Sequence, residues 1–209
     1  MAILVTDPAI EEQLCLEREA SGADRYDEVW DGIYMMAPMP DDEHQYLVLR
    51  LGYILEDIVG IPGQGQVRAG VNLSDRKTDW KNNYRVPDVA VFLNDGKAEN
   101  QETHWCGAAD FLVEIISQYD KSRDKVPFYE RLGVREVLLI DRDPWKLELW
   151  RFQNGSLSLA GTSSMGSSGV DTSDRFTSLT VSLSFGLHVE TPRPKIDVKH
   201  VESDRQWLV

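Results

Sequence analysis

Cysteine is scarce in this sequence, which has only Cys15 and Cys106 among its 209 residues. The two lie far apart and show none of the paired spacings of a disulfide scaffold or a zinc knuckle, so the chain is typical of a reducing compartment. No apolar run approaches the roughly 18 residues of a membrane-spanning helix. The first residues also lack the basic start and long apolar run of a signal peptide. These absences predict a cytoplasmic protein that does not enter a membrane.

Basic residues are also in short supply. Lys and Arg total 22 against 35 Asp and Glu, which gives a formal net charge of −13 at pH 7. Nucleic-acid binding draws most of its strength from basic side chains that neutralise phosphates, so a chain this acidic binds DNA poorly unless its basic groups cluster. The sequence has two clusters of basic residues. The simpler interpretation of the first is that its charges lie in solvated loops. The first contains Arg68, Arg76, Lys77, Lys81 and Arg85, and the second Lys121, Arg123 and Lys125.

Apolar runs define the predicted fold. Residues 86–93, 111–117 and 134–141 read as buried strands, and a helix at about 122–132 joins the last two in a β-α-β crossover. The fold class is therefore α/β (α+β), a mixed central sheet flanked by helices, with additional strands at both ends. Helices are also predicted at 8–20 and 42–59, a hairpin at 26–36 around Asp31-Gly32, and further strands at 66–73, 146–152, 157–160 and 179–187.

Length and composition favour one domain. A chain with 42% hydrophobic and 27% charged residues is ordinary for a globular protein of this size. Residues 1–190 are predicted to form the domain, with a mobile serine- and glycine-rich loop at 162–173. Residues 191–209, interrupted by a Pro-Arg-Pro segment, are predicted to be a peripheral tail.

Two carboxylates interrupt the apolar strands. Asp88 and Glu114 are expensive to bury unless they are paired or bound to a cation, so they indicate a divalent metal site. The alternative is a structural salt bridge between strand ends, with Arg85 or Lys125 as the partner. Lys125 and Tyr129 are one helical turn apart and are expected on one helix face.

Several short segments around these residues share their order and spacing with a known family. Together they resemble the Uma-type putative restriction endonucleases of the PD-(D/E)XK nuclease superfamily. The matching segments are 27–32 (Asp-Glu-Val-Trp-Asp-Gly), Pro40 with His44, 87–89 (Pro-Asp-Val), 113–117 (Val-Glu-Ile-Ile-Ser), Lys125 with Tyr129, 133–134 and 138–141, with a weaker match at 183–187.

The resemblance implies a restriction-endonuclease-like fold and hydrolysis of DNA phosphodiester bonds. It assigns Asp88 and Glu114 to a magnesium ion, which manganese could replace, because hard cations prefer oxygen ligands. Lys125 would stabilise the negative charge that develops at the phosphate. Much of the superfamily has this lysine two residues after the glutamate, where this chain has Ile116. Lys125 must therefore reach in from the helix, with Lys121 as the fallback.

Three further residues match family positions and are candidates for supporting roles. His44 could contact phosphate or support a ligand, or it could simply cap or pack the start of its helix. Glu28 could support the site or be exposed, and Tyr129 is expected beside Lys125. Ile33 stands where the family often has a glutamate, so an additional carboxylate ligand is not expected there.

A second function of another class fits the same sequence. A non-catalytic protein could keep the nuclease fold as a binding or assembly module, which the acidic charge and the absence of the strand lysine favour. The enzyme interpretation implies DNA as the partner. It also implies a homodimer, because nucleases that cut both strands commonly pair two sites, and residues 176–187 offer apolar material for a self-complementary surface.

Overall fold

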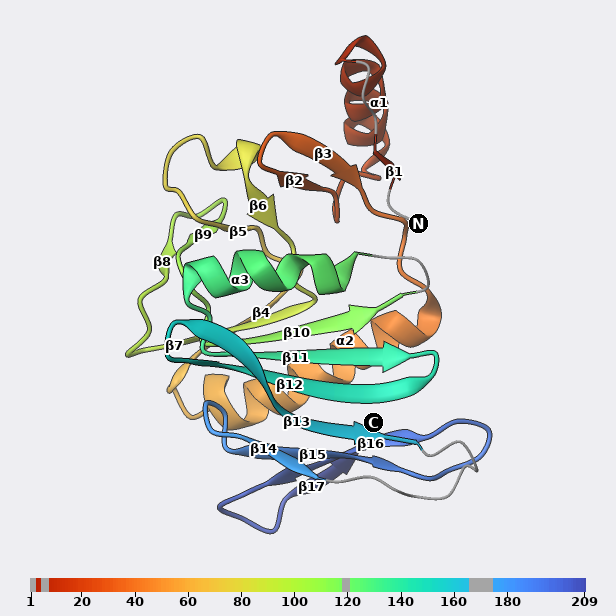
Figure 1. Ribbon diagram of the computed structural model, residues 1–209, viewed down its shortest axis with the longest axis vertical. Helices are drawn as coiled ribbons and strands as arrows, with labels where there is room; N and C mark the ends of the chain where they lie inside the picture. The colour runs from red at the N-terminus through yellow and green to blue at the C-terminus, as the bar shows by residue number, and fades with distance from the viewer. Residues whose placement is uncertain (1–2, 5–7, 118–120, 166–174) are drawn as a thin grey trace.

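The computed structural model describes residues 3–4, 8–117, 121–165 and 175–209. In these residues a six-stranded mixed sheet forms the centre (Figure 1). Within it, β10 and β11 run parallel and the other neighbours run antiparallel. In spatial order, its strands are β13 (Ser156–Ser164), β12 (Trp145–Gln153), β11 (Glu136–Arg142), β10 (Phe111–Ile116), β7 (Val89–Leu93) and β4 (Gly65–Ala69).

Helices cover both faces of this sheet. The chain passes from β10 to β11 through a 3-10 turn, η3 (Ser122–Lys125), and then α3 (Val126–Leu132), which is the predicted β-α-β crossover. The opposite face is covered by α2 (Asp42–Leu55), which continues into a short π-helical turn, η1 (Glu56–Gly60). Apolar residues three or four apart share one helix face, so α2 buries Leu47, Leu51 and Ile54 against the sheet.

Alternation along β10 decides which side chains reach which face. Phe111, Val113 and Ile115 pack in the layer that contains α2, whereas Leu112 packs in the layer that contains α3. Glu114 follows the two-residue period of Leu112 and therefore points to the α3 side. This alternation places one carboxylate beneath the start of α3.

A second sheet of short strands lies above α3 in Figure 1. Its hairpin turns at Asp31 and Gly32, both with positive φ, as the sequence predicts. The polar stretches 74–84 and 94–107 contain parts of this sheet that the sequence does not reveal, because two-residue strands are too short to show a period. In spatial order, the strands are β1 (Ile3–Leu4), β3 (Ile33–Met36), β2 (Glu28–Trp30), β6 (Tyr84–Arg85), β5 (Leu73–Ser74), β9 (Trp105–Cys106) and β8 (Glu99–Asn100), with a 3-10 turn, η2 (Trp80–Asn82), before β6.

The N-terminal helix α1 (Pro8–Ser21) stands beside this second sheet at the top of Figure 1. Arg18 of this helix forms an ion pair beside the sheet, with its Nε atom 2.5 Å from Asp27 Oδ2. None of the helices in the described parts of the chain combines the length and apolar character that crossing a membrane requires.

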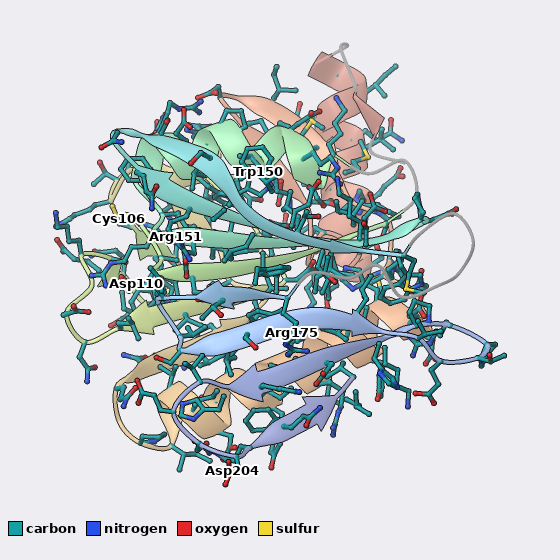
Figure 2. All side chains as sticks on the ribbon, turned by 60° about the horizontal axis from the view of Figure 1, so that its bottom comes forward. Cys106, Asp110, Trp150, Arg151, Arg175 and Asp204 are labelled. Atoms are coloured by element: carbon teal, nitrogen blue, oxygen red, sulfur yellow. The ribbon has the colours of Figure 1, made fainter. Side chains whose placement is uncertain are left out.

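The C-terminal region differs from the expected structure. Residues 179–187 do not return to the central sheet; they contribute to a separate sheet formed by β14 (Phe176–Ser178), β15 (Leu183–His188), β16 (Lys195–His200) and β17 (Gln206–Leu208). Figure 2 brings this sheet forward, with Arg175 joined to Asp197 across 2.7 Å. Ile196 and Val198, in the expected tail, are buried in the core. The prolines of that segment precede β16 and do not interrupt it.

Two smaller expectations also change. Part of the apolar material expected to form a self-complementary surface at 176–187 is buried, because Phe176, Leu183 and Phe185 point into the core, whereas Leu179 is exposed. The loop expected at 162–173 begins later, since residues 162–164 continue β13. Residues 166–173 lie outside the described residues.

Candidate active site

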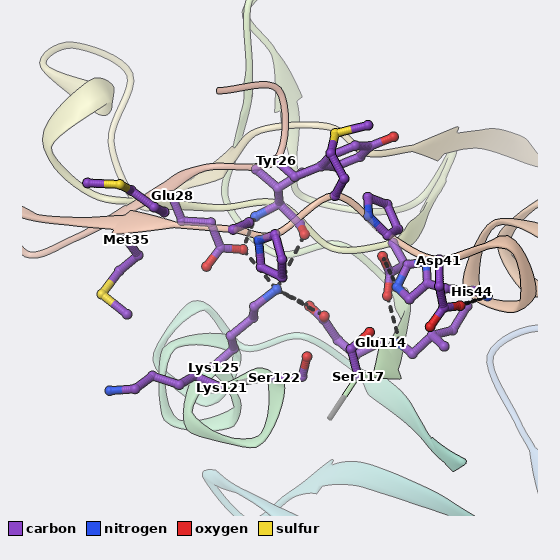
Figure 3. A pocket seen from close by; sticks show the side chains of 18 of the residues that line it. Tyr26, Glu28, Met35, Asp41, His44, Glu114, Ser117, Lys121, Ser122 and Lys125 are labelled. Atoms are coloured by element: carbon purple, nitrogen blue, oxygen red, sulfur yellow. Dashed lines mark hydrogen bonds and ion pairs between the residues drawn. The ribbon is translucent and has the colours of Figure 1, made fainter. Parts of the chain in front are cut away.

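The register of β7 and β10 brings the two predicted carboxylates together. Val89 pairs with Val113 in an antiparallel ladder, so Asp88 and Glu114 occupy the next position outward. Directly opposed residues in such a ladder carry their side chains on the same face. The Asp88 Oδ2 atom accepts a hydrogen bond of 2.6 Å from the backbone N–H of Ile115. Both carboxylates line a cleft of about 310 Å³ (Figure 3).

Glu114 is held from the α3 side by two groups. Lys125 Nζ lies 3.0 Å from its Oε2 atom, and the Tyr129 hydroxyl donates a hydrogen bond to Oε1. The chain turns through η3 before α3 begins, so Lys125 stands at the N-cap of α3 one turn before Tyr129. Lys125 therefore approaches Glu114 from the segment from which the sequence analysis expects it to reach in.

Burial and neighbouring charges shift the pKa values of Glu114 and Lys125. Glu114 is only 1% exposed, and burial raises the pKa of its carboxyl well above the usual value. Burial alone would lower the pKa of Lys125, but the nearby carboxylates of Glu114, Glu28 and Asp88 outweigh it and raise that pKa. The neighbouring carboxylates therefore favour the charged form of Lys125.

Glu28 belongs to the cleft as well. Its Oε1 atom lies 2.8 Å from Lys125 Nζ and also accepts a hydrogen bond of 2.7 Å from the backbone N–H of Val86. The Trp30 indole donates to its Oε2 atom at 2.6 Å. Glu28 is buried. The interpretation of Glu28 as an exposed hairpin residue is thus wrong, because Lys125, the Val86 N–H and the Trp30 indole enclose its carboxylate.

His44 lies at the start of α2 and contacts Asp88. It lies in the first turn of α2, where the Asp41 side chain caps the helix by accepting a hydrogen bond of 2.8 Å from its backbone N–H. Its ring Nε2 lies 3.2 Å from Asp88 Oδ1. Within the described residues, the buried Nδ1 atom has no hydrogen-bond partner. His44 therefore fixes the orientation of Asp88 from the α2 side.

The fallback lysine does not reach the carboxylates. Lys121 lines the cleft but is exposed, and its side chain points away from Glu114 in Figure 3. Ile116 packs partly buried against the α3 layer, and Ile33 is 48% exposed. Lys125 supplies the ammonium group that binds Glu28 and Glu114.

Arg85 packs against two aromatic rings and does not pair with Asp88. Its guanidinium lies 4.5 Å from the Trp30 ring centroid and 4.2 Å from that of Phe128, which joins the hairpin to α3 by cation–π contacts. Its Nη1 atom donates to the Val29 carbonyl at 3.0 Å. The salt bridge considered between Arg85 and Asp88 is therefore not formed.

Sequence reasoning missed an ion-pair network that fixes the entry of α2. Arg142 Nη1 lies 2.8 Å from Asp41 Oδ1 and 3.1 Å from Glu43 Oε2, and its Nη2 atom donates to Ser117 Oγ at 3.3 Å. The network ties the ends of β10 and β11 to the turn that carries His44. The signal in the sequence was the aspartate three residues before His44, which is typical of a helix N-cap.

The donor set suits a hard divalent cation. Three carboxyl groups, those of Glu28, Asp88 and Glu114, lie near the single ammonium group of Lys125 in a mostly buried place. Among the described residues, no group of three or more His, Cys, Asp or Glu side chains is arranged so that it could hold a metal ion. Magnesium is commonly bound by one or two carboxylates and keeps several waters, so Asp88 and Glu114 are the residues that would hold such an ion.

Comparisons with known proteins agree with this architecture. One solved structure has the same fold, with a TM-score of 0.52 at 17% sequence identity, and the match covers 64% of this chain and 75% of that one. It is described as a putative nuclease belonging to DUF820 from Anabaena variabilis ATCC 29413. The restriction-endonuclease-like fold class is thereby confirmed. The chain belongs to the Uma2 family, described as putative restriction endonuclease, whose model matches residues 10–185. No curated protein matches the chain.

Proposed function

We propose that this protein is a metal-dependent endonuclease that hydrolyses phosphodiester bonds in DNA, with magnesium as the metal and manganese as a substitute. The observation that carries the proposal is the meeting of Glu28, Asp88 and Glu114 around Lys125 in one cleft. A structural ion pair needs one carboxylate for one lysine. The surplus carboxylates are costly without a further cation, and they favour a metal site.

Each residue has a distinct task in the proposed hydrolysis. Asp88 and Glu114 would hold the cation, which supplies Lewis acidity to the phosphate and lowers the pKa of a bound water. His44 and the Ile115 N–H keep the Asp88 carboxylate oriented, while Tyr129 does so for Glu114. Lys125 stabilises the charge that develops at phosphorus as water attacks and the P–O bond breaks.

An assay with purified protein tests this proposal. Supercoiled plasmid and single-stranded DNA are incubated at low salt with magnesium, with manganese, and with a chelator. Low ionic strength makes weak phosphate binding by an acidic protein most visible. Metal-dependent cleavage that disappears in the Asp88→Asn protein supports the proposal. Cleavage that persists undiminished in that variant points to a contaminating nuclease or another site.

The alternative is a non-catalytic binding or assembly module. Ion pairs within the first basic cluster favour it, because Arg76 Nε lies 3.1 Å from Asp75 Oδ1 and Lys77 Nζ lies 2.6 Å from Glu99 Oε2. These pairs reduce the positive charge available for phosphates. The module predicts no metal-dependent cleavage under any condition of the assay.

A homodimer remains part of the enzyme proposal. Since most apolar side chains of residues 176–187 are buried in the core, this segment offers mainly the exposed Leu179 for such a contact. Light scattering over a range of protein concentrations tests it, and a monomer at every concentration removes it.

A further inference from the structure

One side of the cleft is almost free of charge. It is built from Tyr26, Trp30 and residues 35–40, whose sequence is Met-Met-Ala-Pro-Met-Pro. We name this surface the apolar wall. Met39 is 71% exposed, whereas Met35 and Met36 are buried beneath it. Figure 3 shows Tyr26 in the upper part of the view, with Lys125 and Glu114 below it.

The apolar wall is held in place by a buried carboxylate. Asp27 Oδ1 accepts a hydrogen bond of 2.7 Å from the backbone N–H of Ala37, and Arg18 Nη2 donates to the Ala37 carbonyl at 2.9 Å. The Tyr34 hydroxyl also donates to Asp27. These contacts fix the backbone at the centre of the wall before any ligand arrives. A preorganised surface loses less conformational entropy on binding than a mobile one.

The dimensions of the cleft favour one nucleotide unit over a duplex. Its volume of about 310 Å³ is at the small end of the range for ligand pockets, about 300–1,000 Å³. The carboxylates are recessed, with exposed side-chain fractions of 15% for Asp88 and 1% for Glu114. The scissile phosphate therefore has to enter the cleft. A flexible single strand can deliver a phosphate with its base, whereas a base inside a duplex must first be unstacked and unpaired.

The arginines next to two residues of the cleft, Asp41 and Ser122, favour the same substrate. Arg142 pairs with Asp41 and Glu43, and Arg123 pairs with Asp141, its Nη2 lying 3.2 Å from Oδ2. These arginines are already neutralised, and duplex binding depends on many phosphate contacts. Single-strand binding gains affinity from stacking of bases on aromatic side chains as well as from charge. A polarisable methionine side chain also makes favourable contacts with aromatic rings.

We propose that the apolar wall binds the base of an unpaired nucleotide, so that the protein acts on single-stranded DNA in preference to duplex DNA. This inference rests on the proposed nuclease function and specifies its substrate class. The base lies on Tyr26 and Met39 while its phosphate faces Asp88, Glu114 and Lys125.

Cleavage rates give the first test. A single-stranded oligonucleotide and a blunt duplex of the same sequence are compared at low salt with magnesium. We expect the single strand to be cleaved at least tenfold faster at subsaturating concentration. Cleavage of the duplex at an equal or higher rate overturns the inference while leaving the proposed nuclease function intact.

Binding gives the second test and does not require cleavage. Fluorescence anisotropy is measured in magnesium with labelled single strands that carry either normal or abasic nucleotides, using Lys125→Ala protein so that the strands stay intact. The double substitution Tyr26→Ala and Met39→Ala should weaken binding of the normal strand at least about fivefold, the lower end of the effect of losing one stacked base. It should leave binding of the abasic strand unchanged, because only the normal strand has a base to lose.

A matched control separates stacking from structural damage. Ile61 is 72% exposed, like Met39, but it is not among the residues that line the cleft. Ile61→Ala, introduced into the Lys125→Ala protein, should bind both strands as that parent protein does. Equal affinity of the parent for normal and abasic strands overturns the inference, as does equal weakening of both strands by the double substitution. Absence of all cleavage by the wild-type protein overturns the proposed function instead, and base-dependent binding is then still decided by the anisotropy measurement.

Discussion

The Nζ atom of Lys125 lies 3.0 Å from the Oε2 atom of Glu114, although the two residues belong to different elements separated by a turn. The same nitrogen lies 2.8 Å from Glu28 in the hairpin. In a nuclease, this geometry holds the lysine where it can face both the metal ligands and an incoming phosphate. A purely structural pair would give the protein stability alone, and the predictions below separate the two roles.

Replacing Lys125 tests its electrostatic role. Lys125→Ala should reduce cleavage by at least about a hundredfold, the scale of losing one preorganised electrostatic group. Metal binding should be retained, since the substitution leaves the carboxylates in place. Lys121→Ala is the matched control, because Lys121 lines the same cleft but is exposed. Single-turnover rates measure the effect, and equal losses in the two variants would contradict the assigned role.

Replacing Asp88 tests the metal site itself. Asp88→Asn removes the charge of one carboxylate and should abolish both magnesium binding and cleavage. Isothermal titration with magnesium and manganese measures binding independently of activity, and circular dichroism checks the fold. Undiminished metal affinity in this variant would remove Asp88 from the proposed ligands.

His44 should act on metal affinity through Asp88. His44→Ala removes the contact at 3.2 Å to the Asp88 carboxylate, and loss of a group that orients a metal ligand typically costs about 10–100-fold in affinity. Manganese titration is the measurement. His104 is the control, because it is buried against Trp80, with ring centroids 4.7 Å apart. His104→Ala should leave the metal affinity of folded protein unchanged, and a similar loss there would indicate a general structural effect.

A buried ion pair outside the cleft should govern stability without affecting the site. Glu136 is 1% exposed, pairs with Arg151 at 2.7 Å and accepts a hydrogen bond from Ser178. Glu136→Ala leaves the Arg151 charge without its partner and should lower the free energy of unfolding by about 3–5 kcal/mol. Glu99→Ala, which breaks an exposed pair with Lys77, should cost at most about 1 kcal/mol. Urea unfolding compares the two, and costs of equal size would contradict the assignment.

The sequence was most informative where residues form long, regular elements. The apolar runs that became β10 and β11 are six and seven residues long, so their period and burial were visible, and Glu114 stood out within one of them. Family resemblance then supplied the pairing of Glu114 with Lys125. Asp88 was marked by the same apolar context at the start of β7.

Other parts of the site and fold depend on contacts between distant segments. Glu28 approaches Lys125 only because the hairpin packs beside α3, and a three-residue strand carries no signal of that contact. The Arg142 network joins residues about a hundred positions apart in the same way. Strands β16 and β17 were missed because prolines at 192 and 194 indicate an end of structure, yet the apolar alternation of Ile196 and Val198 directly follows them.

The cleft also connects two sheets, since Lys125 contacts both Glu28 of the short-stranded sheet and Glu114 of the central sheet. Strands of two to four residues contribute few contacts each, and regions of this kind open locally at lower free energy than a packed core. Such an opening would separate Glu28 from Lys125 while the central sheet stays folded. Heating should therefore inactivate the protein at a lower temperature than the one at which the central sheet melts, and cooling should restore activity without refolding of the whole chain.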